Sequence, residues 1–243
     1  MITFKQFISE SINDKGILKA IFVIGIPGAG KSYTVKQLNG TVTPRIINTD
    51  KAGEFLSAKT GTQINSKTWH EMFKDSATRI TRNSITGYLD GMLPLFVDGT
   101  SNDASNILHR MGILESLGYD VGIVYVSTSL EVAKARAKAR EKEINRAVDD
   151  SFIDEVHSRS EENAQYLKTK VHFFKEIKND GDLNDEIMLK AFKAVQGFFD
   201  EEVQNPVGKR ALEKLKEAKQ KYLVPSVISK EILEKKVDGW YKR

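Results

Sequence analysis

Leu18-Lys-Ala-Ile-Phe-Val-Ile-Gly25-Ile-Pro-Gly-Ala-Gly30-Lys31-Ser32 joins an apolar run to a glycine-rich loop that ends in Lys-Ser. The run has the length of a buried parallel strand, and residues 33–38 behind the loop are typical of a helix. Residues 25–32 match the pattern G-x-x-x-x-G-K-[ST] in full, in the strand-loop-helix context that this pattern requires. The glycines let backbone amides turn inward at a helix N-terminus, where they form a nest for anions. The stretch therefore predicts a phosphate-binding loop (P-loop) that binds a nucleoside triphosphate.

Two side chains of this loop have predicted ligands. Lys31 is expected to reach the β and γ phosphates, and the hydroxyl of Ser32 to coordinate Mg²⁺. Motors, switches and kinases share such a loop, so the loop alone does not name a reaction. A kinase also needs a base beside the acceptor hydroxyl, a carboxylate for hydrated magnesium and arginines over the γ-phosphate.

The rest of the chain alternates between strand and helix patterns. Further apolar strand signals lie at residues 45–48, 93–97, 121–126 and 171–177. Helical patterns cover residues 3–12, 51–58, 66–89, 103–117, 130–143 and 184–199. Strands that alternate with helices of this length indicate βαβ units, and hence an α/β fold with a parallel sheet covered on both faces.

Composition excludes several classes of protein. The 243 residues include no cysteine, which rules out disulfides, thiolate metal sites and a cysteine nucleophile. The four scattered histidines argue against a histidine-rich metal site. Hydrophobic residues make up 40% and charged residues 29%, as in ordinary globular proteins. No apolar run approaches the roughly 20 residues that span a bilayer, and residues 1–15 lack a signal-peptide core. We therefore expect a cytoplasmic protein without a membrane partner.

The C-terminal segment is distinctly basic. Residues 205–243 hold eleven Lys and Arg against five Asp and Glu, within a formal net charge of +4 for the chain. A basic segment favours phosphate-rich partners, so contact with nucleic acid or protein is one interpretation. A solvated helix face is the other. The Asn-Pro-Val-Gly stretch that ends at Gly208 suggests a boundary, followed by two helices, and the aromatic Trp240 and Tyr241 are expected to dock on the core or a partner rather than stack on bases.

Two aspartates follow predicted strands. Asp50 ends the second strand, and Asp98 the third, so both point into the crevice where parallel sheets bind ligands. Asp50 is expected to take the proton of an acceptor hydroxyl, with a helix N-cap as the alternative role. Asp98 is expected to hold Mg²⁺ through water, and Thr100 to offer its hydroxyl to substrate or phosphate. Asp103 is expected to cap the next helix.

Arginines gather after the fourth strand. Arg136 and Arg140 are spaced i, i+4 on one helix face, and Arg146 follows in a polar stretch suited to a lid at about residues 141–150. Guanidinium groups that close over a triphosphate neutralise the charge that develops in phosphoryl transfer. Three arginines in one segment favour this role over a solvated charged helix.

With these residues placed, residues 16–200 resemble the zeta-toxin and polynucleotide-kinase-like P-loop kinases. The resemblance implies a three-layer sandwich whose five-stranded parallel sheet has the order 2-3-1-4-5. It implies that Asp50 is the general base, that Asp98 and Thr100 serve magnesium or the acceptor, and that the arginines form the lid. It also implies that Asn179 lies near the adenine. The implied nucleotide-binding positions are Gly25, Pro27, Gly28, Ala29, Gly30, Lys31, Ser32, Tyr33 and Asn179.

The chain departs from both branches of this group. Polynucleotide kinases carry an arginine shortly after the aspartate of strand two, whereas Lys51-Ala-Gly-Glu54 follows here. Zeta toxins bind a sugar nucleotide through an acidic residue upstream of strand three, for which Glu71 and Asp75 are candidates without a firm alignment. Residues 1–10 resemble the opening of many tailed-phage proteins, which suggests a phage-encoded protein acting in a host cytoplasm.

The prediction is a kinase that uses ATP, or GTP, with Mg²⁺ and phosphorylates a hydroxyl of a nucleotide-like molecule or a polynucleotide end. The acceptor pocket is expected within residues 51–89, with Trp69, His70, Arg79 and Arg82 as candidates. One alternative is a catalytically weak nucleotide-binding protein that acts through its basic tail. The other is a nucleic-acid-stimulated ATPase. The predicted parts are an N-terminal helix (1–15), a kinase domain (16–204) and a basic helical extension (205–243).

Overall fold

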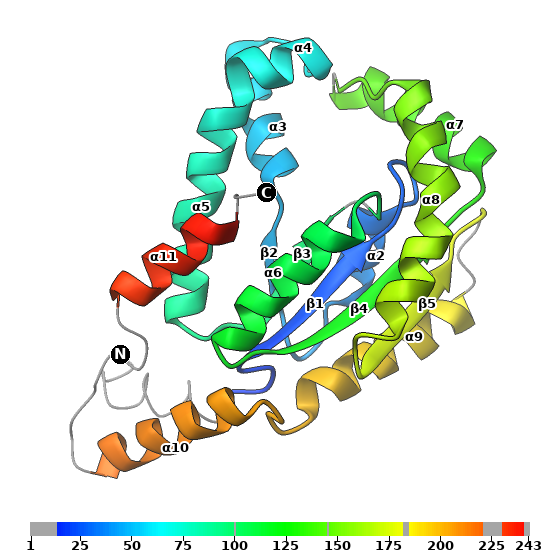
Figure 1. The fold of residues 1–243 in the computed structure, drawn as a ribbon. Helices are drawn as coiled ribbons and strands as arrows, with labels where there is room; N and C mark the ends of the chain where they lie inside the picture. Colours follow the sequence, from blue (N-terminus) through cyan, green and yellow to red (C-terminus); the bar gives the residue numbers. More distant parts are fainter. Residues whose placement is uncertain (1–13, 100, 145, 182–184, 221–229, 241–243) are drawn as a thin grey trace.

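The computed structural model describes residues 14–99, 101–144, 146–181, 185–220 and 230–240. Five parallel strands form one sheet in the order β2-β3-β1-β4-β5, as predicted (Figure 1). The strands are β1 (Lys19–Ile24), β2 (Arg45–Ile47), β3 (Leu95–Asp98), β4 (Asp120–Ser127) and β5 (Phe173–Lys178). The helix predicted at residues 3–12 lies outside the described residues.

Helices surround the sheet on both faces, which completes the predicted three-layer α/β sandwich. They are α2 (Lys31–Leu38), α3 (Thr49–Thr60), α4 (Ser66–Thr68), α5 (Lys74–Asp90), α6 (Ala104–Ser116), α7 (Leu130–Ile144), α8 (Asp150–Lys168), α9 (Asp185–Asp200), α10 (Pro206–Gln220) and α11 (Lys230–Trp240). A π-helical segment, η1 (Trp69–Phe73), joins α4 to α5 within the stretch that the sequence predicted as one helix. Within the described chain, no helix combines the length and the apolar character needed to cross a membrane.

The central strand β1 is buried on both faces, which explains its unbroken apolar run. Phe22 belongs to a core cluster formed with α5, α6 and α11, whereas Ile21 and Val23 belong to a second cluster formed with α2 and α9. Both faces of the strand that leads into the P-loop are therefore fixed by packing, so the loop begins at a rigid position.

Helix α8 was not singled out by the sequence pattern. Its buried positions include Ile153, Val156 and Leu167 at helical spacing, but Ser160 and Ala164 interrupt the apolar stripe. Burial of a small polar side chain is possible here because the hydroxyl of Ser160 lies 2.5 Å from that of Ser101. The stripe was weak in sequence because polar contacts replace part of the apolar packing.

The C-terminal helices wrap around the sandwich. Asn205 starts α10, because its side chain accepts hydrogen bonds from the backbone amides of Val207 and Gly208. Helix α11 then packs on α5 and α6 (Figure 1). Trp240 is 2% exposed and stacks on Phe22 with ring centroids 6.5 Å apart. The prediction that Trp240 docks on the core is confirmed, while Tyr241 lies outside the described residues.

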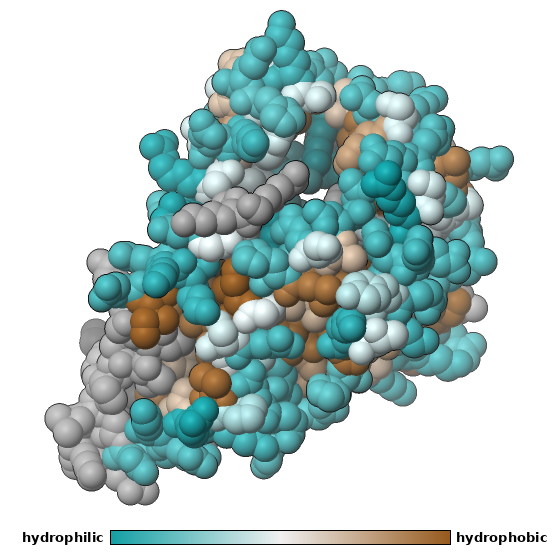
Figure 2. All heavy atoms as spheres, in the orientation of Figure 1, coloured by the Kyte–Doolittle hydropathy of each residue, from teal (hydrophilic) through white to brown (hydrophobic). Residues whose placement is uncertain are grey.

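The face seen in Figure 1 divides by polarity. Figure 2 shows mainly hydrophilic side chains over its upper part, around α3, α4 and α7, and apolar ones gathered lower down around α6. The carboxyl ends of the strands point toward the hydrophilic part, between α3 and α7 (Figure 1). The polar groups that the sequence singled out lie at this end of the sheet.

Candidate active site

The P-loop connects β1 to α2, and its glycines are structurally required. Gly28 and Gly30 have φ of 82° and 90°, a region that favours glycine. A Cβ on Gly28 would lie 2.2 Å from the carbonyl oxygen of Ala133, and one on Gly30 would lie 2.3 Å from the side-chain nitrogen of Asn179. The loop backbone is therefore pressed against α7 and the segment after β5, and no side chain fits in between.

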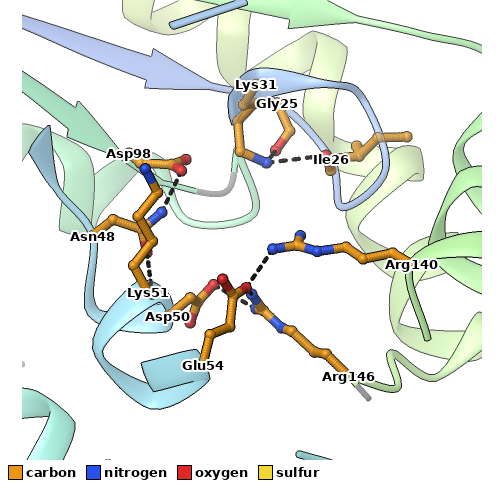
Figure 3. Close-up of polar contacts among 10 residues, drawn as sticks. All are labelled: Gly25, Ile26, Lys31, Asn48, Asp50, Lys51, Glu54, Asp98, Arg140 and Arg146. Carbon is orange, nitrogen blue, oxygen red and sulfur yellow. Dashed lines mark hydrogen bonds and ion pairs between the residues drawn. The ribbon is translucent and has the colours of Figure 1, made fainter. Parts of the chain in front are cut away.

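Lys31, the first residue of α2, folds back over this loop. Its ammonium donates hydrogen bonds to the carbonyl oxygens of Gly25 (2.9 Å) and Ile26 (3.1 Å) (Figure 3). Burial lowers the pKa of Lys31 from its ordinary 10.5, while the charges of Asp98 and Asp50 act in the opposite direction. An anion in the loop would favour the charged ammonium, so Lys31 is suited to bind phosphate.

Asp98 ends β3 beside the P-loop, as predicted. The side-chain amide of Asn48 donates to its carboxylate at 2.6 Å. Burial raises the pKa of Asp98 above its ordinary 3.8; Lys31 lowers that pKa and Asp50 raises it. A half-buried carboxylate at this position is a suitable ligand for a hard cation such as Mg²⁺.

Asp50 lies in the first turn of α3 and does not cap the helix. The cap is Asn48, whose side chain accepts a hydrogen bond from the backbone amide of Lys51. The alternative role for Asp50 as an N-cap is therefore wrong. Its carboxylate instead accepts a hydrogen bond from Arg146, with Nη2 2.5 Å from Oδ2.

Two of the three predicted lid arginines meet at this point. Arg140 and Arg146 both form ion pairs with Glu54, one turn after Asp50 on α3 (Figure 3). The Nη1 atom of Arg146 lies 2.8 Å from Oε1 of Glu54. Burial disfavours the charge on Arg146, but its ion pairs and hydrogen bonds with Asp50 and Glu54 outweigh this and raise its pKa above the ordinary value of an arginine.

The lid segment is tied to the loop behind α3. Residues 141–144 continue α7 and Asp150 begins α8, so the described loop of the predicted lid is 146–149. The backbone amide of Ala147 donates to the carbonyl of Ile64 at 2.9 Å, next to a bridge between Ile64 and Arg146. Arg146 is therefore held by its backbone as well as by its side chain.

Arg136 contacts a different group. Its guanidinium donates to the backbone carbonyl of Asn179 (3.0 Å), to the side-chain oxygen of Asn179 (3.1 Å) and to the carbonyl of Gly181 (3.2 Å). Asn179 is buried and donates to the carbonyl of Ala29 in the P-loop at 2.7 Å. The structure thus places Arg136 with Asn179 rather than with Arg140 and Arg146, and this contact joins the P-loop to the segment after β5.

The remaining predicted positions are distributed as follows. Pro27 lies in the P-loop, Ser32 follows Lys31 in α2, and Tyr33 is 53% exposed beside it. Asp103 caps α6, as predicted, by accepting a hydrogen bond from the amide of Asn106. Thr100 lies outside the described residues.

Most candidates for the acceptor pocket either contact other residues of the protein or are exposed to solvent. Trp69 packs against Gly53, where a Cβ would lie 2.3 Å from the indole ring. The Nδ1 atom of His70 lies 2.8 Å from the carbonyl oxygen of Ser66, and Arg82 forms an ion pair with Asp238 of α11. Three further candidates, Glu71 on η1 and Asp75 and Arg79 on α5, are exposed.

The donor set fits a metal ion that completes its coordination with phosphate and water. Among the described residues, no group of three or more His, Cys, Asp and Glu side chains is arranged to hold a metal. Mg²⁺ in phosphate-transfer sites usually takes only one or two protein carboxylates, together with phosphate oxygens and water. Asp98 and the hydroxyl of Ser32 flank the P-loop and suit this mode of binding.

Sequence comparison identifies the family. The sequence model described as zeta toxin matches residues 9–186, more than half of the chain. The chain belongs to the zeta toxin family. The match ends at the start of α9, so α10 and α11 lie outside the matched residues. No curated protein matches the chain.

Solved structures share the fold of this zeta toxin family member. The PezAT chromosomal toxin–antitoxin system of Streptococcus pneumoniae aligns with a TM-score of 0.51 at 19% identity, over 89% of this chain and 96% of that chain. A Chloroflexus aurantiacus protein provisionally assigned as a kinase aligns with a TM-score of 0.52 at 13% identity, over 74% and 98%. At such identities the likeness concerns the fold, and with the family match it places the chain among the P-loop kinases.

The sequence analysis of this family member missed Glu54. The available signal was its spacing, because a residue four positions after Asp50 faces the same side of a helix. What the sequence did not show is that two arginines approach that face from the other side of the site.

Proposed function

We propose that the protein is an ATP- and Mg²⁺-dependent kinase that transfers the γ-phosphate to a hydroxyl of a nucleotide-like acceptor. The observation that supports this proposal is the convergence of charged groups at one end of the sheet. Asp98, Asp50, Arg146 and Arg140 all act electrostatically on Lys31. A P-loop that only binds a magnesium nucleotide needs one carboxylate for the metal, but it needs neither a second one such as Asp50 nor arginines beside it.

The proposed roles follow from these positions. Lys31 binds the β and γ phosphates, and Asp98 and Ser32 hold the metal. Mg²⁺, when bound, offsets the charge of the phosphates. Asp50 accepts the proton of the acceptor hydroxyl, whose oxygen forms a bond to the γ-phosphorus as the bond to the β-γ bridging oxygen breaks and ADP leaves. Arg140 and Arg146 neutralise the charge that develops on the transferred group.

The nucleotide base is proposed to bind near Asn179. The buried amide of this residue connects the P-loop to the segment after β5, and Arg136 holds that segment in place. In this arrangement Arg136 acts by orienting the nucleotide pocket. A contact between Arg136 and phosphate remains the prediction from sequence.

The proposed acceptor is a sugar nucleotide or the 5′-hydroxyl of a polynucleotide. Membership of the zeta toxin family supports the former, and the lack of an arginine shortly after Asp50 disfavours the latter. Arg79, exposed on α5, is available for a phosphate of the acceptor, whereas Arg82 is paired with Asp238. Contact of the basic tail with nucleic acid or protein, a phage origin and action in a host cytoplasm remain predictions.

The test is transfer of labelled phosphate from ATP to a panel of sugar nucleotides and 5′-hydroxyl oligonucleotides. Asp50→Asn is expected to lower the rate by about 10²–10⁴-fold, the usual contribution of a positioned base. Asp200→Asn, an exposed aspartate at the far end of α9 that pairs with Lys15, is the matched control and should retain full activity.

The outcomes separate the proposal from its alternatives. Equal transfer by the wild type and by Asp50→Asn would remove Asp50 from the mechanism. ATP binding without transfer to any acceptor would favour the nucleotide-binding interaction protein. ATP turnover that nucleic acid stimulates without a phosphorylated product would favour the ATPase.

A further inference from the structure

Glu54 lies between the proposed base and the two lid arginines. It follows Asp50 by one helical turn on α3, and its side chain is 25% exposed. Oε1 of Glu54 accepts hydrogen bonds from both Arg140 and Arg146 (Figure 3). A single carboxylate oxygen therefore brings two guanidinium groups together against their mutual repulsion.

Arg146 is divided between two carboxylates. Its Nη2 donates to Oδ2 of Asp50 at 2.5 Å, and its Nη1 donates to Oε1 of Glu54 at 2.8 Å. The side chain of Arg146 is 16% exposed, so water competes weakly for either contact. Among the hydrogen bonds of the described residues, none involves Oδ1 of Asp50, so one oxygen of this carboxylate is available to another partner.

This division matters because a guanidinium prefers a different geometry. The two parallel N–H groups of an arginine fit both oxygens of one carboxylate, and such bidentate pairs are common and strong. Arg146 in that geometry on Asp50 would engage both oxygens of the carboxylate. An aspartate with both oxygens engaged by a guanidinium is a weaker base, because the nearby cation stabilises the carboxylate and each oxygen keeps only its outer lone pair for a hydroxyl proton. Glu54 occupies Nη1, so the end-on form of this pair, in which Nη1 and Nη2 face one carboxylate, is not available to Asp50.

We infer that Glu54 is a positioning residue. By binding Nη1 of Arg146, it keeps one oxygen of Asp50 free. Its importance for catalysis rests on the proposed role of Asp50 as the base, but its effect on the arginine does not. Arg140, bound to the same oxygen of Glu54, is held beside Asp50 by the same contact.

The first experiment is the crystal structure of the nucleotide-free Glu54→Gln variant. A neutral amide oxygen accepts a weaker hydrogen bond than a carboxylate, so Arg146 is expected to turn and contact both oxygens of Asp50. Glu54→Asp keeps the negative charge, so Arg146 is expected to keep one hydrogen bond to residue 54 and one to Asp50. Glu155→Gln, which removes an exposed ion pair with Arg159 on α8, is the control and should leave the site unchanged. An Arg146 that stays bonded to one oxygen of Asp50 in Glu54→Gln would overturn the inference.

The second experiment is kinetic and uses the acceptor found in the transfer panel. Glu54→Gln is expected to lower kcat by about 10²-fold, the scale of a misplaced reacting group, and Glu54→Asp to recover most of it. The KM for ATP should change less than the kcat, and the affinity for MgADP should match the wild type, which shows that the fold is intact. A wild-type kcat in Glu54→Gln would also overturn the inference. Lack of any transfer by the wild type would instead count against the proposed kinase, and the crystal structure would still decide the role of Glu54.

Discussion

Replacement of Trp240 by alanine tests whether the C-terminal helix is part of the folded core. Trp240 ends α11, is 2% exposed and stacks on Phe22 of β1 at an interplanar angle of 25°. The guanidinium of Arg110 lies 5.4 Å from its ring centroid. Leu233 and Val237, each 1% exposed, bury the same side of the helix. The substitution removes the largest of these side chains and leaves a cavity against the strand that leads to the P-loop.

The expected magnitude follows from this burial. A fully buried tryptophan or phenylalanine replaced by alanine costs about 3–5 kcal/mol of unfolding free energy. In a chain of this size each 1 kcal/mol lowers Tm by about 2–4 °C, so the loss corresponds to roughly 6–20 °C. Trp240→Phe keeps an aromatic ring against Phe22 and should cost less. Lys235→Ala, at an exposed position of the same helix, should change stability by less than about 0.5 kcal/mol.

The assay is equilibrium unfolding in urea, followed by far-ultraviolet circular dichroism. A loss below about 1 kcal/mol for Trp240→Ala would refute the reasoning, because a buried, stacked indole cannot be removed at that cost. An equal loss for Lys235→Ala would show that the effect comes from α11 as a whole rather than from the buried ring.

Two further predictions concern the P-loop, and a third concerns a glycine of α5. Burial lowers the pKa of Lys31 below 10.5, and the charge of a bound triphosphate raises that pKa again. Binding of MgATP should therefore be coupled to uptake of a proton in the pH range just below 10.5, where part of the free protein carries a neutral Lys31. Calorimetry in buffers of different ionisation enthalpy measures this uptake; it should be absent in Lys31→Arg, and equal uptake in both proteins would contradict the assignment. Gly28→Ala, at φ 82° with a backbone oxygen 2.2 Å from the new Cβ, should destabilise the protein by at least about 1–3 kcal/mol and weaken MgADP binding. Gly87→Ala, in α5 with no atom within 4 Å of the new Cβ, should stabilise the protein by about 0.5–1 kcal/mol. Urea unfolding measures both variants, and a change in unfolding free energy of the same sign for the two would contradict this pair of predictions.

Positions close together in the sequence gave the most accurate predictions. Asp103 was predicted as a cap and its carboxylate accepts the amide of Asn106, because a cap depends on residues three positions apart. The choice between Asn48 and Asp50 as the cap of α3 was harder, because both are good capping residues two positions apart. In the structure Asn48 caps the helix, and Asp50 instead binds Arg146, which lies 96 positions away.

The arginines show the limit of a helical pattern. Arg136 and Arg140 share a face of α7, and the sequence predicted a common role for them. In the structure Arg136 binds Asn179 and Arg140 binds Glu54. The difference arises because successive turns of α7 pass different neighbours, the segment after β5 and then α3. Periodicity fixes which side of a helix a residue is on, but not which element lies opposite.

The sequence by itself determined the P-loop, the parallel α/β fold and the aspartates at the strand ends. These features depend on contiguous residues and on the period of apolar burial, so a short window of the chain encodes each of them. Only the tertiary structure decided that Glu54 joins Arg140 and Arg146 beside Asp50. These ion pairs connect residues 86 to 96 positions apart. Their formation depends on how α3 and α7 are oriented across the sheet, which is set by the packing of the whole core.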